Sequence, residues 1–317
     1  MQKRIGGYFE LELPVKQEYH LEALALNSGR FCLEYLLRCK KYKKVYVPYF
    51  TCDSALEPIR KLNIPHAFYH IDTTYHIVDS ILLKKDEALL YTNYWGLMDD
   101  YCLELYEKYG QQLILDYTQA FFSKAIAGCD TFYSCRKFFG VPDGGYLYTD
   151  IIFDFKIQTD ESYKRIDSLI KRIDLSPEAG YVDFQKTSEL FHDMPIRYMS
   201  KFTKRMMAGL DYLAISKQRK NNYNYLANAL GEKLLDKDAV PMIFPYKCEA
   251  GQELRKYLIE KKIFVAKYWP NVDTYEGVSK VEAWMTNHIL PLPIDQRYSE
   301  EDMDYIVQNV NEFSTLK

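Results

Sequence analysis

Lys137 has the surroundings that covalent chemistry on a carbonyl compound requires. It follows a β-rich run and precedes a turn rich in glycine and proline, residues 140–145. The aromatic neighbours Phe138 and Phe139 would exclude water from its amine, and Arg136 adds a positive charge beside it. Both effects favour the neutral amine, which is the nucleophilic form and can form a Schiff base. Taken alone, the position also fits a surface lysine in a hairpin.

Asp116 is a second candidate, because it follows three apolar residues at the end of a predicted strand. An acid at the carboxyl edge of a sheet is costly to leave unpaired, and a protonated pyridine nitrogen is one cation that could pair with it. Gln119 lies three residues further on. The alternative is an aspartate that caps the next turn.

Residues 27–30 form a third candidate at the start of a predicted helix. Asn27 and Ser28 are good helix caps, and Gly29 lets a ligand approach the backbone closely. The free N–H groups at a helix N-terminus suit a phosphate. Arg30 opposes the helix dipole unless an anion binds nearby. A plain capped helix is the alternative interpretation.

Strands and helices alternate through the first 150 residues. We expect strands at 44–50, 66–71, 87–96, 111–121, 129–139 and 144–153, and helices at 30–42, 53–62 and 99–110. This alternation predicts an α/β fold, with a mostly parallel sheet between two layers of helices. Ligands bind beyond the carboxyl ends of such strands, and the candidate residues are expected at that edge.

The rest of the chain predicts a helical segment followed by a smaller lobe. Residues 155–235 are charged and helical in pattern, and a break follows at 240–247. Beyond it we expect strands at 242–247, 263–269 and 288–294, with helices at 251–262 and 299–313. We therefore divide the chain into a large α/β domain, residues 1–235, and a small C-terminal α+β domain, residues 236–317.

Composition argues against several classes of protein. A net charge of -3 gives no basic excess to bind nucleic acid or an anionic membrane. No apolar run is long enough for a membrane span or a signal peptide. The seven cysteines are scattered and form no CxxC pair. We therefore expect reduced thiols in a cytoplasmic protein, with no disulfide frame and no metal site.

The order of these sites resembles the DegT/DnrJ/StrS family of fold-type-I aminotransferases, which use pyridoxal 5'-phosphate (PLP). The family shares a phosphate turn, a strand-end D-x-x-[QH] and a lysine followed by two glycines. These are matched by Ser28-Gly29-Arg30, by Asp116 with Gln119, and by Lys137 with Gly144-Gly145. Weaker similarity at 92–100, 217–226 and 290–307 extends the resemblance over most of the chain.

The resemblance implies a role for each site. Lys137 would carry PLP as a Schiff base and would move a proton between substrate and cofactor. Asp116 would keep the pyridine nitrogen protonated, so that the ring withdraws electrons. The phosphate would be bound by Ser28, Gly29, Arg30 and Ser134. Gln119 would contact the ring or its phenolic oxygen.

The resemblance also implies an activity. The chain would transfer an amino group, with glutamate as donor, to the keto group of a nucleotide-linked sugar, in the biosynthesis of polysaccharides or related amino sugars. Family members are homodimers whose sites draw on both subunits. Two alternatives stay open: a PLP enzyme of the same family with a different reaction or acceptor, and a non-catalytic relative that acts as a binding subunit.

Three departures from the family pattern concern the details of the site. Cys52 stands where the family has the aromatic residue that stacks on the ring, so Tyr49 or Phe50 must take over or the ring must stack differently. Phe132 stands where the family has a serine five residues before the lysine. Residues 196–200 only loosely resemble the family's N-Y-R-M-S segment, which reaches into the partner's site. Cofactor binding is therefore better supported than the identity of the substrate.

Overall fold

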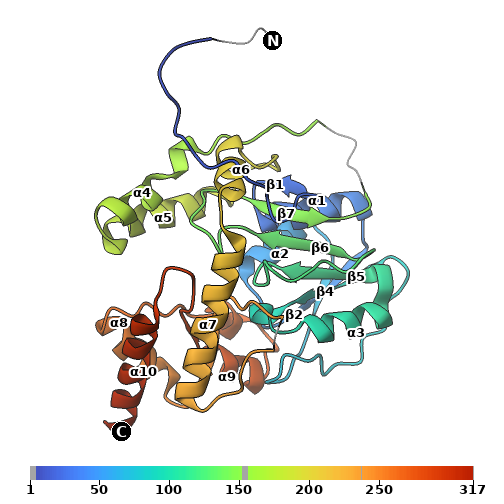
Figure 1. The fold of residues 1–317 in the computed structure, drawn as a ribbon. Helices are drawn as coiled ribbons and strands as arrows, with labels where there is room; N and C mark the ends of the chain where they lie inside the picture. The colour runs from blue at the N-terminus through green and yellow to red at the C-terminus, as the bar shows by residue number, and fades with distance from the viewer. Residues whose placement is uncertain (1–4, 152–155, 237, 317) are drawn as a thin grey trace.

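A central sheet with helices on both faces positions the candidate residues (Figure 1). The computed structural model describes residues 5–151, 156–236 and 238–316, and within these ranges the sheet has seven strands in the order β1-β7-β6-β5-β4-β2-β3. The strands of this sheet are β1 Leu24–Leu26, β2 Lys44–Pro48, β3 His66–Tyr69, β4 Glu87–Thr92, β5 Leu113–Tyr117, β6 Asp130–Ser134 and β7 Gly145–Tyr148. The α-helices of this part of the chain are α1 Gly29–Lys40, α2 Asp53–Lys61, α3 Asp99–Tyr109, α4 Asp167–Asp174, α5 Pro177–Leu190, α6 Lys201–Ala208 and α7 Tyr212–Leu230.

Alternating side chains along the strands build a separate core on each face of the sheet. Leu89 and Tyr91 of β4 point into one core, whereas Leu90 of β4 and Ile114 of β5 point into the other. The second core also contains buried residues of α1 and α2, which therefore cover that face. This two-residue period on strands that are buried on both faces is typical of a parallel sheet between helices.

The predicted α/β fold is confirmed, since β2, β3, β4, β5 and β6 pair in parallel. β7 runs antiparallel to both β6 and β1, which the sequence pattern did not indicate. The strand expected at 87–96 ends at Thr92, because a short 3-10 turn follows at Tyr94–Gly96 and its middle residue, Trp95, has a φ of 62°. The strand expected at 144–153 is β7, and residues 152 and 153 lie outside the described residues.

The C-terminal lobe is built on an antiparallel pair of strands. Its elements are β8 Phe244–Lys247, α8 Gly251–Glu260, α9 Lys280–His288, β9 Ile289–Leu292 and α10 Glu300–Thr315. The strand predicted at 263–269 is wrong, because this segment turns back on α8: Ile263 N–H donates to the carbonyl of Leu258. Tyr223 and Leu226 of α7 pack into the core of this lobe, so the division at residue 235 stays a prediction.

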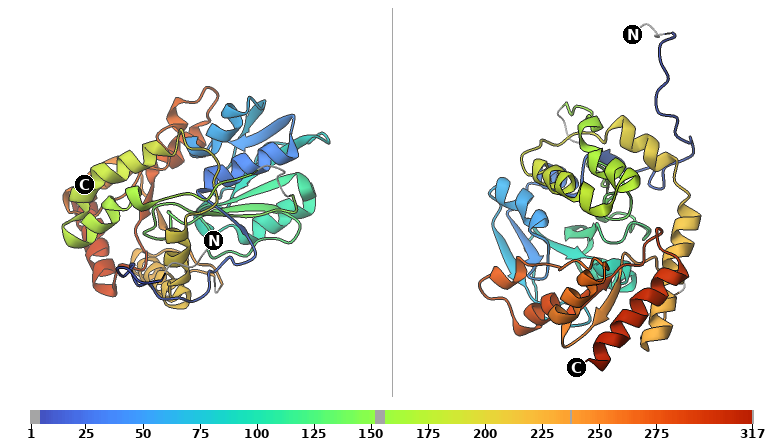
Figure 2. Two further views of the ribbon diagram at one scale, coloured as in Figure 1. Left: turned by 90° about the horizontal axis from the view of Figure 1, so that it is seen from above. Right: turned by 90° about the vertical axis from the view of Figure 1, so that its left-hand side faces the viewer.

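α4 and α5 follow β7 and precede α6 in the sequence, and they pack against each other as a helical pair. Figure 2 shows this pair from two sides. The two helices approach closely at Gly180, where a Cβ atom would lie 2.7 Å from the carbonyl oxygen of Ser168. Several large apolar side chains of the pair remain exposed, among them Ile173, Leu175, Tyr181 and Phe184. The pair and the turn that joins its helices therefore expose several apolar side chains.

His20 fixes the segment before β1 against the sheet. It is buried, its Nε2 lies 2.8 Å from the carbonyl oxygen of Phe121, and its Nδ1 lies 3.1 Å from the hydroxyl of Tyr148. Burial lowers the pKa of His20 to about 4, although the bond to the Phe121 carbonyl opposes this shift. The ring is therefore neutral at pH 7.

Acid should destabilise the protein through His20. An unfolded histidine takes up its proton near pH 6.5, whereas this one does so only near pH 4, so the stability present above pH 6.5 is lost as the pH falls towards 4. The expected loss in the free energy of unfolding is about 3 kcal/mol. Urea unfolding at pH 7 and pH 4.5 measures it. An equally steep loss in His20→Gln would contradict the assignment.

Candidate active site

The carboxyl end of β5 carries a buried acid in a fixed orientation. Asp116 is only 6% exposed, and its Oδ1 accepts a hydrogen bond of 2.8 Å from the backbone N–H of Thr118. Burial raises the pKa of Asp116, while the nearby positive charge of Lys137 lowers it. A cation bound against this carboxylate would stabilise its ionised form further.

Lys137 reaches the same point from the next strand. It lies three residues beyond the end of β6, and its Nζ donates a hydrogen bond of 2.9 Å to Oγ1 of Thr118. Thr118 therefore contacts both the acid and the amine that the sequence singles out. Thr118 itself is not among the residues expected from the sequence, although it lies inside the D-x-x-Q motif that begins at Asp116.

The N-terminus of α1 lies beside this pair. Ser28 is the N-cap residue, yet its hydroxyl makes no capping bond, and its Oγ is buried without a hydrogen-bond partner among the described residues. A Cβ atom on Gly29 would lie 2.9 Å from Cγ2 of Thr118 and 3.6 Å from Cβ of Ser134. The structure thus brings Ser28, Gly29, Ser134 and the lysine–acid pair to one edge of the sheet.

Gly144 and Gly145 hold the turn before α1 in place. The backbone N–H of Gly144 donates to the carbonyl of Asn27, at 2.8 Å. A Cβ atom on Gly145 would lie 2.6 Å from the carbonyl carbon of Ser28 and 2.7 Å from the nitrogen of Gly29. The backbone of β7 can approach the turn this closely only because residue 145 has no side chain.

Gly145→Ala should therefore destabilise the fold by displacing the turn at Ser28. We expect the free energy of unfolding to fall by about 1–3 kcal/mol, because the new methyl group meets backbone atoms that have no room to move. Gly140→Ala is the control, since its Cβ would make only an ordinary contact, 3.8 Å from Leu169. Urea unfolding of both variants tests this, and equal stability of the two would refute the close approach.

Gln119 supplies a further unpaired donor at this edge. It is fully buried, and its Oε1 accepts a hydrogen bond of 3.0 Å from the backbone N–H of Trp95. That bond fixes the amide, and its Nε2 is left without a partner among the described residues. A buried N–H₂ group of this kind suits an acceptor atom of a ligand.

The side chain of Arg30 does not extend freely from the helix. Its guanidinium pairs with the carboxylate of Glu57 on α2, which also contacts Nδ1 of His192 at 2.8 Å. The unfavourable position of Arg30 in the first turn of α1 is thus relieved by an acid of the same chain. Because its side chain is paired in this way, Arg30 would bind an anion through its backbone N–H.

Neither expected substitute for the missing ring-stacking residue faces the site. Tyr49 stacks between Phe68 and His70, and Phe50 is buried in the core. Tyr268 of the small lobe instead lies over this region, with its ring 5.3 Å from that of Trp95. The aromatic wall beside Gln119 is therefore provided by Trp95 and Tyr268.

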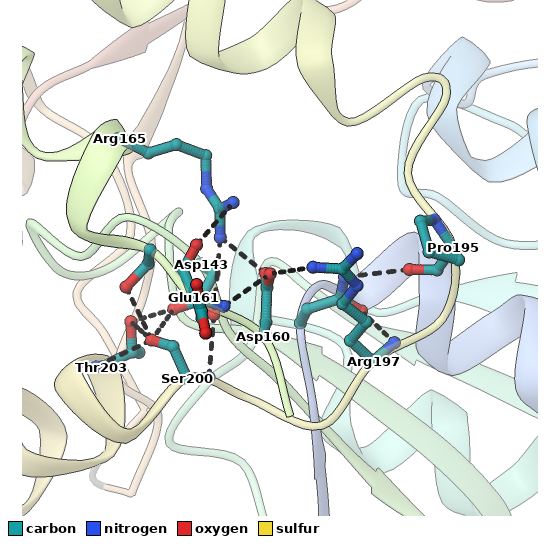
Figure 3. A network of polar contacts seen from close by, with 10 residues as sticks. Asp143, Asp160, Glu161, Arg165, Pro195, Arg197, Ser200 and Thr203 are labelled. Atoms are coloured by element: carbon teal, nitrogen blue, oxygen red, sulfur yellow. Dashed lines mark hydrogen bonds and ion pairs between the residues drawn. The ribbon is translucent and has the colours of Figure 1, made fainter. Parts of the chain in front are cut away.

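A buried polar network supports the turn before α1 from the other side (Figure 3). The backbone of Asn27 pairs with that of Arg197, and Asn27 Oδ1 accepts from the N–H of Arg197. Asp160 lies between Arg197, at 3.2 Å, and Arg165, at 2.6 Å. Asp143, which precedes the two glycines, accepts hydrogen bonds from Ser200 at the start of α6. The segment around residue 197 thus contacts the turn that precedes α1 in the same chain.

Arg219 of α7 joins the lysine loop to the small lobe. It is buried, and its guanidinium donates to the carbonyls of Phe138, at 3.3 Å, and Met242, at 3.0 Å. Gln296, which precedes α10, bonds to both Nε of Arg219 and the carbonyl of Phe138. The residue directly after Lys137 is therefore held by two side chains from other parts of the chain.

Several solved aminotransferases share this architecture. The aminotransferase TlmJ from Streptoalloteichus hindustanus is 14% identical, with 93% of this chain and 87% of that chain covered and a TM-score of 0.64. A DegT/DnrJ/EryC1/StrS aminotransferase from Brucella abortus is 17% identical, with 92% and 85% covered and a TM-score of 0.61. The chain has the aminotransferase fold.

A third structure with this fold, a protein from Streptococcus pneumoniae, is known in PLP and PMP forms. In its PLP form it is 14% identical, with 90% of this chain and 85% of that chain covered and a TM-score of 0.59. No protein-family model and no curated protein matches the sequence. The resemblance found in the motifs is therefore confirmed by structure at the level of the fold.

Two features are absent from the described residues. No helix among them is both long and apolar enough to span a membrane. The same residues contain no group of three or more side chains arranged to hold a metal ion.

Proposed function

We propose that this protein is a PLP-dependent aminotransferase. The observation that carries the proposal is the hydrogen-bonded series Asp116–Thr118–Lys137, set against the N-terminus of α1. A buried acid that accepts from the backbone N–H of Thr118, and a lysine amine that donates to its hydroxyl, lie beside a helix that can bind phosphate. These are the parts that PLP chemistry uses. The aminotransferase fold supports the same conclusion.

The residues present fit PLP. The buried and unpaired Oγ of Ser28 at the start of α1 suits its phosphate, and the unpaired Nε2 of Gln119 suits its phenolic oxygen. Asp116 would hold the ring nitrogen, and Lys137 would be joined to the cofactor by a Schiff base. Bound there, PLP supplies an electron sink that stabilises negative charge on the substrate carbon.

The protein's own residues would then position and move protons. Nζ of Lys137 would remove the proton from the substrate carbon and return it, acting as general base and acid. Oγ1 of Thr118 would orient that amine, because it accepts a hydrogen bond from Nζ at 2.9 Å. The carboxylate of Asp116 would keep the proton on the ring nitrogen throughout.

The proposed acceptor is a keto sugar, in nucleotide-linked form, and the proposed donor is glutamate. Support comes from the structural similarity to sugar aminotransferases such as the one from Micromonospora echinospora. We also propose a cytoplasmic homodimer that uses the exposed apolar side chains of α4 and α5. Light scattering after size exclusion tests the dimer.

Cofactor attachment gives the first test of the activity. The protein is incubated with PLP, reduced with borohydride and digested, and a pyridoxyl group should be found on the peptide that contains Lys137. Absence of the label, together with an unchanged absorption spectrum on adding PLP, would refute the proposal. Keto-sugar nucleotides with glutamate then test the acceptor, read out by the appearance of 2-oxoglutarate.

Thr118→Val should slow turnover by about ten-fold, the effect of losing one hydrogen bond to a charged amine. Valine keeps the methyl group that packs on Gly29 and removes only the hydroxyl. Thr118→Ser, which keeps the hydroxyl, is the control. Steady-state rates with saturating glutamate give the comparison, and equal rates for the two variants would contradict a role for Oγ1.

A further inference from the structure

Arg136, the residue directly before Lys137, forms no ion pair with an acid in the part of the chain that the structure describes. Its Nη2 donates one long hydrogen bond, 3.3 Å, to Oγ of Ser188 on α5. Its guanidinium otherwise lies over aromatic rings, 4.7 Å from the centre of Phe191 and 5.8 Å from that of Phe184. Within the described residues, no carboxylate lies at ion-pair distance from it.

Other cations surround Arg136, and each of these has an acid of its own. Arg165 lies over the same Phe191 ring, at 5.6 Å, and pairs with Asp160. Arg30 pairs with Glu57. Burial lowers the pKa of Arg136 to about 10, and the charges of Arg30 and then Arg165 add to this effect, while the more distant charge of Asp143 opposes it. Of these three arginines, Arg136 is thus the one that forms no ion pair with an acid among the described residues.

This unpaired charge lies next to the first turn of α1. The ring of Phe191 is 6.3 Å from that of Phe31, the third residue of the helix. The same helix end holds the buried, unpaired Oγ of Ser28. A partly buried cation among like charges is costly unless an anion binds it, and two independent features here point to the same anion.

The sequence differs from the family pattern at a position that concerns phosphate binding. Phe132, in place of the family's serine, is buried in the core between the sheet and α1, so it supplies no hydroxyl to a phosphate. A phosphate bound at the turn would lose that donor. Arg136 can replace it with up to two charge-assisted hydrogen bonds.

We propose that Arg136 binds the phosphate group of the cofactor, together with Oγ of Ser28 and the first backbone N–H groups of α1. The inference rests on the proposed function in that it names PLP as the ligand. It gives Arg136 the role of phosphate-binding cation, which the sequence had suggested for the side chain of Arg30. Arg136 is a binding residue here and takes no part in proton transfer.

Binding of PLP and of pyridoxal, which lacks the phosphate, separates this role from a general effect on Lys137. We expect Arg136→Met to weaken PLP binding by about 10- to 100-fold, as for the loss of a hydrogen bond to a charged group. Pyridoxal binding should not change. Arg136→Lys should lie between Met and the wild type for PLP. Arg172→Met, an exposed arginine of α4, is the control and should bind both compounds normally.

The affinities are measured by absorption titration, with circular dichroism to show that each variant is folded. Unchanged PLP binding in Arg136→Met, or an equal loss for PLP and pyridoxal, would overturn the inference while leaving the proposed function intact. If the wild-type protein binds neither compound, the proposed function fails. Thermal unfolding in the presence of inorganic phosphate gives a second test. A rise in Tm that is seen in the wild type and lost in Arg136→Met supports an anion site, and the absence of such a rise overturns the inference.

Discussion

Replacing Lys137 with alanine is expected to lower turnover by more than about 1,000-fold, because it removes both the covalent attachment point and the general base. The Asp116–Thr118 bond and the α1 N-terminus do not depend on the lysine, so PLP should still bind through its phosphate and ring nitrogen. Single-turnover rates with glutamate measure the first effect. Equilibrium dialysis of PLP measures the second.

Lys124→Ala is the matched control for this experiment, because Lys124 is exposed and lies between β5 and β6. Borohydride should label this control at Lys137 as in the wild type, and it should label nothing in Lys137→Ala. Turnover in Lys137→Ala within ten-fold of the wild type, about 1.4 kcal/mol in activation free energy, would remove the central residue of the proposed mechanism.

Asp116→Asn is expected to lower turnover by about 100- to 1,000-fold while the protein stays folded. Asparagine can still accept the hydrogen bond from Thr118, so the variant removes the charge and keeps the turn. Without the charge, a protonated ring nitrogen would face a neutral group in a buried site, which costs several kcal/mol. Steady-state rates at saturating PLP provide the measurement.

Asp116→Ala separates the charge from the hydrogen bond. It should lower both turnover and the free energy of unfolding, because the N–H of Thr118 loses its acceptor as well. An Asp116→Asn variant with the rate of the wild type would show that the acid has no electrostatic role. Equal rates for the Asn and Ala variants would show that charge is the dominant contribution.

The sequence predicts the sheet and its carboxyl edge well, because both depend on local pattern. Asp116 ends an apolar run and Lys137 follows a strand, so a parallel sheet necessarily places them on one edge. The direction of β7 was not predictable in the same way. It depends on pairing with β1, whose three residues are too few for a clear periodicity.

Contacts between distant segments explain the remaining differences. The pairing of Arg30 with Glu57 joins α1 to α2, and the position of Tyr268 over Trp95 joins the two lobes. Thr118 could have been singled out only from its place between Asp116 and Gln119. The role of its hydroxyl becomes visible only in the structure, where the turn after β6 brings Nζ of Lys137 within hydrogen-bond distance of it.

The bonds of Arg219 and Gln296 to the carbonyl of Phe138 bear on how the enzyme would exchange one substrate for another. Gln296 of the small lobe and Arg219 together hold the peptide unit that follows Lys137, so a movement of this lobe away from the sheet would pull on Lys137. A hinged opening of the two lobes would therefore disturb the alignment of Lys137 in each cycle. Substrate entry would instead rely on movements of side chains and loops, with the two lobes staying in place.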